Sequence, residues 1–206
     1  MSRLETAERM LASLSGVPMH RLTSGSLTAW ERKEVVRASA EMASMLLSID
    51  DTASRTMTDI AAVCRRMKRD RKGGLDFVVI DYLQMIEAEN SSGRETRETQ
   101  VAQISKRLKR LARELDVPVI AVSQLSRSVE SRQTHIPMLS DLRESGSIEQ
   151  DADVVILLHR EDAYEKDSPR MGEADIIVAK HRNGPTATVV TAFQGHYSRF
   201  VDMHRG

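Results

Sequence analysis

Two short apolar runs, each followed by polar side chains, organise the hydrophobic pattern of the chain. Residues 77–80 (FVVI) precede Asp81, and residues 119–122 (VIAV) precede Ser123 and Gln124. Runs this short and rich in Val and Ile are typical of strands buried on both faces. The long helical pattern between them predicts a parallel pair joined by a right-handed crossover. Because ligands bind beyond the carboxyl ends of such strands, Asp81 and Gln124 are candidate site residues.

Apolar periodicity also predicts the other elements of the chain. Helices are expected over residues 4–14, from a capping box at 28–31, from 56–59 onward, over 101–115, and from a second capping box at 147–150. Strands are expected at residues 45–49, 153–158, 175–179, 186–192 and 199–202, with a hairpin turn at Asn183 and Gly184. This order predicts an α/β fold with a mostly parallel sheet and a hairpin-rich C-terminal end, formed as one domain over residues 1–206.

Composition narrows the classes of function. Lys and Arg together number 30, as do Asp and Glu, so the net charge of +0 gives no global signature of nucleic-acid or membrane binding. The basic residues that end the third helix and line the helix at 101–115 are therefore interpreted first as solvated helix surface. The single cysteine, Cys64, fits a reducing compartment, and no apolar stretch is long enough to span a membrane, so the expected location is cytoplasmic.

Four side chains are candidates for phosphate chemistry. A carboxylate at the position of Asp81 can hold a magnesium ion beside nucleotide phosphates, or can simply cap the following turn. The amide of Gln124 can sense a phosphate or satisfy a neighbouring backbone group. Lys180 and Arg182 should point the same way at the end of a hairpin, because side chains in a strand alternate. They suit a phosphate supplied by another subunit, or are a solvated hairpin tip.

Residues 140–147 (SDLRESGS) precede a predicted helix. Gly146 would allow close approach to a phosphate and Arg143 would add charge, although a simple N-capped helix start explains the segment equally well. The six histidines show no metal-ligand spacing, and Cys64 lies on an apolar helix face that is typical of core. The residues alone therefore favour a nucleotide site without deciding its use.

Four motifs in this order closely resemble the C-terminal motor domain of DnaB-type replicative DNA helicases, from Met1 to about Met203. They are DYLQ at 81–84, SQLSR at 123–127, LSDLRESGSIEQDAD at 139–153 and KHRNGP at 180–185. The resemblance implies a RecA-like P-loop NTPase core that uses ATP and Mg²⁺ to move along single-stranded DNA and unwind duplex during replication. It also implies a homo-hexameric ring in the cytoplasmic replisome, with a primase and a helicase loader as partners and no membrane.

The resemblance also assigns roles to residues. Asp81 is similar to the Walker B aspartate that orients magnesium through water, and Gln124 to the sensor that couples the γ-phosphate to the DNA loops. Lys180 and Arg182 are similar to the finger pair that reaches the neighbouring subunit's γ-phosphate. The residues expected at the DNA are Arg127 and Arg132 in the polar loop at 126–135, together with Arg143, Glu144, Ser145 and Gly146. A second polar loop, 87–98, is also expected to face the channel.

The sequence departs from the family pattern at its beginning. It contains no G-x-x-x-x-G-K-[ST] motif, and the family's catalytic glutamate would stand just before Met1. The chain therefore resembles a fragment that lacks the P-loop strand and the collar domain, and it is expected to hydrolyse no ATP alone. Two alternatives remain: a RecA-like ATPase of recombination or regulation, and a truncated product that binds DNA weakly or joins a ring without turnover.

Overall fold

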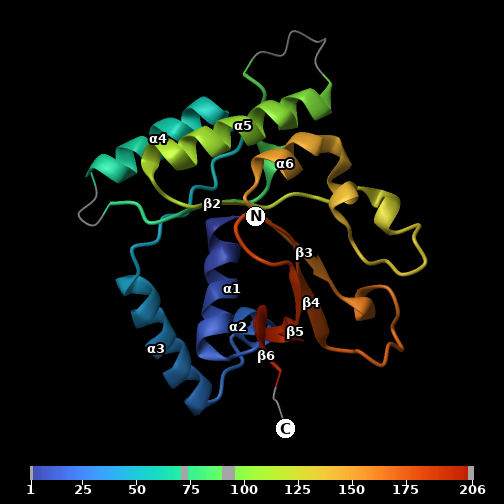
Figure 1. Ribbon diagram of the computed structural model, residues 1–206. Coiled ribbons are helices and arrows are strands. Elements are labelled where there is room, and N and C mark those ends of the chain that lie inside the picture. Colours follow the sequence, from blue (N-terminus) through green and yellow to red (C-terminus); the bar gives the residue numbers. More distant parts are fainter. Residues whose placement is uncertain (1, 71–73, 90–95, 204–206) are drawn as a thin grey trace. The chain divides into compact units, whose positions relative to one another are not determined.

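The computed structural model describes residues 2–70, 74–89 and 96–203, without the side chains of residues 143–145 (Figure 1). The chain forms two compact units. Unit 1 comprises Met1–Thr52, Arg160–Asp175 and Val189–Gly206, and unit 2 comprises Ala53–His159 and Ile176–Thr188. The candidate site residues all belong to unit 2. That the whole chain acts as one domain stays a prediction.

Unit 2 contains a parallel strand pair, as predicted. β1 (Val78–Ile80) pairs with β2 (Val119–Ala121), with Val79 opposite Ile120. The chain between them forms α5 (Arg97–Leu115), whose buried apolar residues are those that the helical spacing indicated: Val101, Ile104, Leu108, Leu111 and Leu115. α4 (Met57–Asp70) lies beside α5 (Figure 1), and Cys64 is buried in their shared core.

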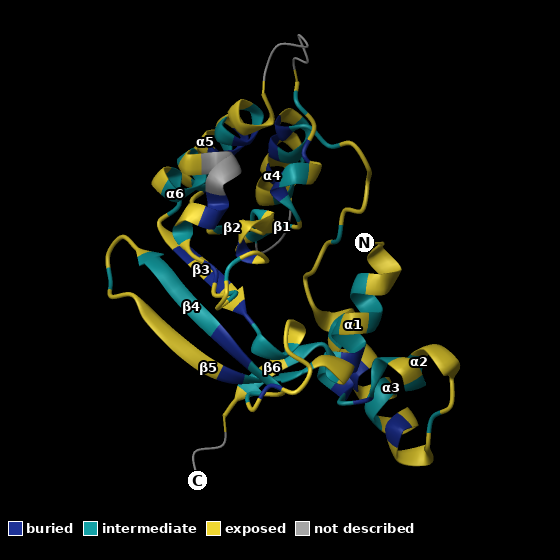
Figure 2. Cartoon of the chain, turned by 90° about the vertical axis from the view of Figure 1, so that its right-hand side faces the viewer, coloured by how far each residue is buried: buried dark blue, intermediate teal, exposed yellow. Residues whose placement is uncertain are grey.

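Within the described residues, the strand pair is covered on one face, so the prediction of burial on both faces is wrong. Ile80 and Val119 pack against the core formed with α4 and α5. Val79 and Ile120 alternate with these positions and are 53% and 54% exposed. Figure 2 colours the chain by burial. The sequence pattern failed here because an apolar run shows that both faces are apolar, not that both are covered.

A second sheet contains the remaining strands in the order β3-β4-β5-β6. Their bounds are Val154–His159, Glu173–His181, Ala187–Gln194 and Arg199–Asp202, respectively. β5 and β6 are antiparallel, and residues 182–186 form the predicted hairpin connection between β4 and β5. Among the described residues, the pair β1–β2 forms a two-stranded parallel sheet, and the C-terminal end is rich in hairpins as expected.

A short helical segment precedes β3. The 3₁₀ helix η3 (Leu139–Ser145) leads directly into α6 (Gly146–Asp151). The predicted helix exists, but the predicted capping box is wrong, because the buried Ser147 hydroxyl has no hydrogen-bond partner among the described residues. α6 continues directly from η3, so a helical turn already precedes its first N–H groups. The start of α6 is therefore not a free helix N-terminus that needs a cap.

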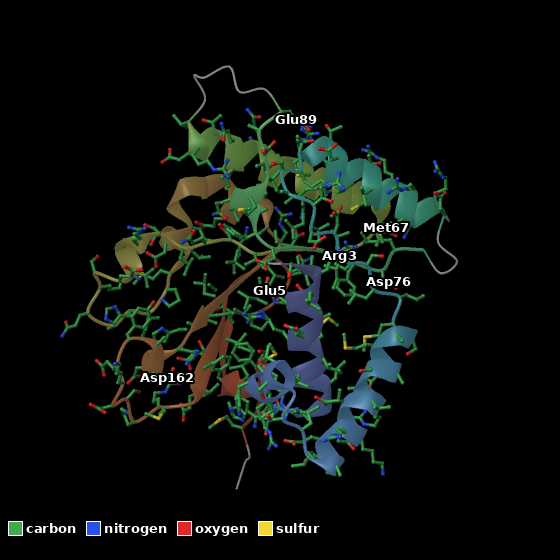
Figure 3. All side chains as sticks on the ribbon, turned by 180° about the vertical axis from the view of Figure 1, so that it is seen from behind. Arg3, Glu5, Met67, Asp76, Glu89 and Asp162 are labelled. Atoms are coloured by element: carbon green, nitrogen blue, oxygen red, sulfur yellow. The ribbon has the colours of Figure 1, made fainter. Side chains whose placement is uncertain are left out.

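Unit 1 contains α1 (Arg3–Ser15), α2 (Met19–Ser24) and α3 (Ala29–Ser44). The predicted helix start at Thr28 is confirmed, since its hydroxyl accepts from the Glu31 N–H and the Glu31 carboxylate accepts from the Thr28 N–H. Gly16 ends α1 with φ of 65°, a conformation that favours glycine. At the start of α1, Arg3 and Glu5 are labelled in Figure 3.

The strand predicted at residues 45–49 is wrong. These residues belong to no strand, and Leu46 and Leu47 are exposed. A strand needs a hydrogen-bonded neighbour, and none of the strands in the described part of the chain pairs with this segment.

Candidate nucleotide and nucleic-acid site

The carboxyl ends of β1 and β2 remain joined beyond the last paired residues. The Val122 N–H donates to the Ile80 carbonyl at 2.9 Å, and the Leu83 N–H donates to the Val122 carbonyl at 2.9 Å. These bonds hold the segments that follow both strands at one edge of the sheet. Asp81 and Gln124 therefore lie where a parallel sheet places its ligands.

The Asp81 side chain is exposed and forms neither a hydrogen bond nor an ion pair with any residue that the structure describes. A capping carboxylate would accept from nearby N–H groups, so the structure offers no support for the simple turn-capping interpretation. An unengaged carboxylate at this position fits the requirement of a hydrated magnesium ion, which prefers one or two carboxylates and keeps several waters. Among the described residues, no group of three or more His, Cys, Asp or Glu is arranged to hold a metal.

Gln84 clamps the two strand ends together. Its Nε2 donates to Ser123 Oγ at 3.1 Å, and its Oε1 accepts from the Gln124 backbone N–H at 3.4 Å. The Gln124 side chain itself is exposed. Sequence analysis gave Gln84 no role, although it lies in the DYLQ motif three residues after Asp81. Its clamp role depends on a contact across 39 residues, which periodicity does not reveal.

Lys180 and Arg182 point to the same side of β4, as the strand period predicts. The Lys180 ammonium donates to the carbonyls of Glu149, Gln150 and Ala152, so it caps the C-terminal end of α6. Arg182 Nη1 lies 3.2 Å from Asp153 Oδ1, and this pair is exposed. Of these two cations, Arg182 is thus the one whose guanidinium can reach a phosphate outside the subunit without uncapping a helix.

Arg132 is engaged within its own loop. Its Nη1 and Nη2 lie 2.9 and 2.7 Å from the two carboxylate oxygens of Asp141, and Nη1 also donates to the Ile136 carbonyl. Asp141 is 3% exposed and also accepts from the Met138 N–H at 2.7 Å. The Arg132 hydrogen bonds, with the Met138 N–H, lower the pKa of Asp141 to about 2. Arg132 therefore acts first as a structural residue of this loop.

The other residues expected at the DNA differ in what the structure shows. Arg127 is exposed, and no described residue pairs with its guanidinium. The side chains of Arg143, Glu144 and Ser145 lie outside what the structure describes. Gly146 has φ of −49°, and a Cβ there would meet nothing within 4 Å, so the fold itself does not require glycine. Its expected use in phosphate approach stays a prediction.

The segment that follows β2 is tied to the segment that precedes α6. The Ser126 N–H donates to the Asp141 carbonyl at 2.8 Å, and Ser128 Oγ lies 3.3 Å from Asp141 Oδ1. Asp141 thus connects the chain after Gln124 to the chain before residues 143–146 through both its backbone and its side chain. A displacement of one segment would be transmitted to the other through these bonds.

The first part of the loop at 87–98 is fixed by an ionic contact. Glu89, labelled in Figure 3, pairs with Arg107 of α5 and accepts from the N–H and hydroxyl of Thr58 in α4. The Arg107 and Thr58 hydrogen bonds lower the pKa of Glu89 to about 2. Residues 90–95 lie outside the described residues. No helix in the described ranges is both long and apolar enough to cross a membrane.

The parallel strand pair β1–β2, joined through α5, places the chain in the α/β class of domains. Residues 1–202 match the family described as "DnaB-like helicase C terminal domain", and the chain belongs to that family.

Named relatives agree with this assignment. A replicative DNA helicase DnaB of Leifsonia xyli is 52% identical over 98% of this chain and 44% of its own length. A replicative DNA helicase DnaB of Geobacillus stearothermophilus is 48% identical over 100% of this chain and 44% of its own length. The chain thus spans less than half of these relatives.

Solved structures show the same fold. One of them, described as an ATPase domain, has a TM-score of 0.93 at 39% identity, and the match covers 99% of this chain and 72% of that domain. A second solved structure also has a TM-score of 0.93 at 39% identity, and the match covers 99% of this chain and 49% of that chain. It is described as "The Structure Of A DnaB-Like Replicative Helicase And Its Interactions With Primase". The fold class that the sequence indicated is therefore confirmed.

Proposed function

We propose that this chain is part of the motor of a replicative DNA helicase, which uses ATP hydrolysis to move along single-stranded DNA and unwind duplex. The observation that supports this best is the exposed, unengaged carboxylate of Asp81 beside Gln124 at the carboxyl edge of β1 and β2, in a chain of this helicase family. A motor needs a magnesium ligand and a phosphate sensor on neighbouring strands, and these two residues satisfy that requirement.

In this proposal each residue has a separate task. Asp81 orients Mg²⁺ and its water, and Gln124 responds to the γ-phosphate. Arg182 approaches the nucleotide of the neighbouring subunit in a homo-hexameric ring, while Lys180 orients that end of β4 through α6. When bound, ATP would supply the γ-phosphoryl group, water would accept it, and Mg²⁺ would offset the developing charge. The residues of this chain position the metal, the water and the transferred charge.

Single-stranded DNA is the proposed polymer substrate. Arg127 and the segment 143–146 contact its phosphates, with Arg132 holding the intervening loop through Asp141. The bond between Ser126 and Asp141 links the phosphate sensor to that segment. A primase is a proposed partner because the description of a similar solved structure names one, and a loader and a place in the cytoplasmic replisome follow from the family.

The 206-residue polypeptide by itself is expected to show no ATP turnover, because its sequence contains no phosphate-cradling loop. The test is therefore a chimaera in which this chain replaces the matching region of the Geobacillus stearothermophilus relative. We expect DNA-stimulated ATPase and unwinding of a forked duplex. The Asp81→Asn variant should lose ATPase by on the order of a hundredfold or more.

The matched control is Asp167→Asn, which removes an exposed carboxylate that no described residue engages. It should leave both activities unchanged. An ATPase that survives Asp81→Asn would contradict the assigned role. A chimaera that hydrolyses ATP in a DNA-dependent way yet unwinds no forked duplex would favour the recombination or regulatory alternative.

A further inference from the structure

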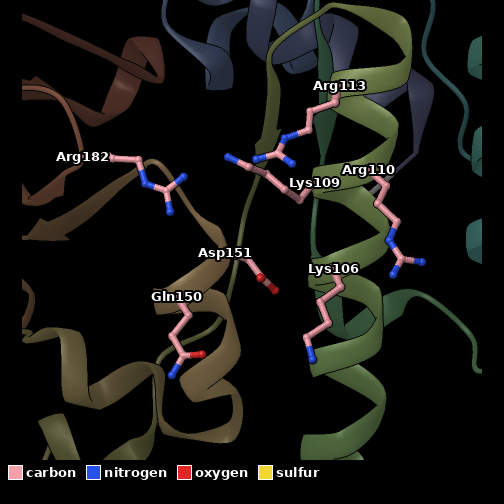
Figure 4. A pocket seen from close by; sticks show the side chains of 7 residues that line it. All are labelled: Lys106, Lys109, Arg110, Arg113, Gln150, Asp151 and Arg182. Atoms are coloured by element: carbon pink, nitrogen blue, oxygen red, sulfur yellow. The ribbon is translucent and has the colours of Figure 1, made fainter.

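A cationic pocket lies in unit 2 between α5, the end of α6 and the end of β4 (Figure 4). Its volume is about 330 Å³, at the lower end of the range for small-ligand sites. The residues that line it are Lys106, Lys109, Arg110, Arg113, Gln150, Asp151 and Arg182. Only Arg182 has a role in the proposed function.

Four of the cations come from one stripe of α5. Lys106, Lys109, Arg110 and Arg113 have the spacing i, i+3, i+4 and i+7, which places them on one side of a helix. The stripe spans roughly 10 Å at 1.5 Å per residue, a length that several linked phosphates can cover. Figure 4 shows Lys109, Arg113 and Arg182 turning toward one another at one end of the pocket.

The pocket has an excess of positive charge that the carboxylates described around it do not neutralise. Five cations line it, and the nearby carboxylates are Asp151, in the lining, and Asp153, which pairs with Lys109 and Arg182. Five positive and two negative charges leave a net charge of three. Lys106 and Arg110 form no ion pair with any residue in the described ranges. Like charges held this close favour binding of an anion.

The carbonyls at the end of α6 do not oppose an anion, because Lys180 already binds those of Glu149, Gln150 and Ala152. One group in the pocket does oppose it. Asp151 Oδ2 is shielded from solvent and accepts no hydrogen bond within the described structure. Its charge should weaken anion binding. A variant that removes this charge should therefore bind the anion more tightly, whereas variants that remove a cation should bind it more weakly.

We propose that this pocket binds a small oligophosphate anion of the pyrophosphate or triphosphate class, with the α5 stripe and Arg182 contacting the phosphates. A volume of about 330 Å³ is large enough for a small oligophosphate. The same phosphates could be those of a free ligand or of DNA, and the two sources are separated in the experiment. The proposal needs no ATP hydrolysis, so its failure would leave the helicase function untouched.

The experiment titrates the 206-residue chain with inorganic triphosphate by calorimetry at low salt. Lys106→Gln with Arg113→Gln should weaken binding roughly tenfold, since each partly exposed cation contributes a few-fold. Asp151→Asn should tighten binding a few-fold. The control, Arg66→Gln with Lys166→Gln, removes the same charge from two exposed positions outside the pocket and should leave affinity unchanged.

A single-stranded oligonucleotide of thymidine is titrated in parallel. The proposal holds if triphosphate binds and the variants change its affinity as stated. It also requires that the oligonucleotide, despite its greater length, binds with an affinity similar to that of triphosphate. It is overturned if the control double variant weakens triphosphate as much as the pocket variant does, or if Asp151→Asn has no effect. It is also overturned if the oligonucleotide binds more than tenfold tighter through the same residues with a steeper salt dependence, which would assign the stripe to a DNA strand.

Discussion

Replacing Asp141 by Asn should destabilise unit 2 far more than replacing a carboxylate in a similar but exposed ion pair. Asp141 is 3% exposed and receives two guanidinium bonds from Arg132. Lowering its pKa from an ordinary value of 3.8 to about 2 corresponds to roughly 2 kcal/mol of stability. Asparagine would keep the shape but lose the charge and present an NH₂ to one guanidinium donor, which costs about 1 kcal/mol more.

The expected loss for Asp141→Asn is therefore about 2–3 kcal/mol. It should stay below the value for a fully buried pair because Arg132 is 25% exposed and can turn to water. The control is Glu114→Gln. Glu114 pairs with Arg65 through bonds of 2.5 and 2.8 Å, but these side chains are 47% and 54% exposed. Glu114→Gln should destabilise the chain far less than Asp141→Asn, because water and salt screen an exposed ion pair.

Urea unfolding followed by far-ultraviolet circular dichroism would measure both variants. Fluorescence of Trp30 would not serve, because the single tryptophan lies in α3 of unit 1. The folded-state pKa of Asp141 is depressed, so its stabilisation is fully present above the unfolded value of 3.8 and is lost as pH falls toward about 2. The difference in the free energy of unfolding between wild type and Asp141→Asn should become smaller over that pH range. The reasoning would be refuted if, at pH 7, Asp141→Asn lowered the free energy of unfolding no more than Glu114→Gln does.

Three further predictions concern the caps and the open sheet face. Lys180→Met should cost about 1–2 kcal/mol and speed hydrogen exchange in α6, because several carbonyls lose a donor, whereas Lys180→Arg should retain most of the protection. Thr28→Ala should cost about 1 kcal/mol by Trp30 fluorescence, because the α3 capping box is lost. Ile120→Lys should change stability by under about 0.5 kcal/mol and reduce binding of an apolar dye, whereas Leu108→Ala should cost about 2–4 kcal/mol.

Elements fixed by local pattern were predictable from the sequence. The helix over 101–115 was placed correctly because its apolar spacing determines which side packs, and the hairpin after β4 was placed by its Asn-Gly turn. The parallel pairing of β1 and β2 followed from the strand–helix–strand order. In each case the information lies within one element or its immediate connection.

Features that depend on distant partners were not predictable in the same way. The Gln84 clamp joins segments 39 residues apart, and the Lys180 cap of α6 joins segments about 30 apart. Arg132 was expected at DNA because the family resemblance implies that its polar loop faces the channel. Its buried partner, Asp141, becomes evident only when the loop is folded.

The open face of β1 and β2 illustrates why the end of a strand is easier to locate from the sequence than the packing around it. Asp81 and Gln124 follow two strands that pair in parallel, as expected from a local feature of the sequence, and their roles at a site stay predictions. Burial of Val79 and Ile120 depends instead on what packs above them, and within the described residues they are more than half exposed. The sequence specifies an apolar surface on both sides of the strand pair. Among the described residues, the side with Ile80 and Val119 packs against the core that includes α4 and α5, so the burial of each side is decided by neighbouring elements and not by the strand sequence alone.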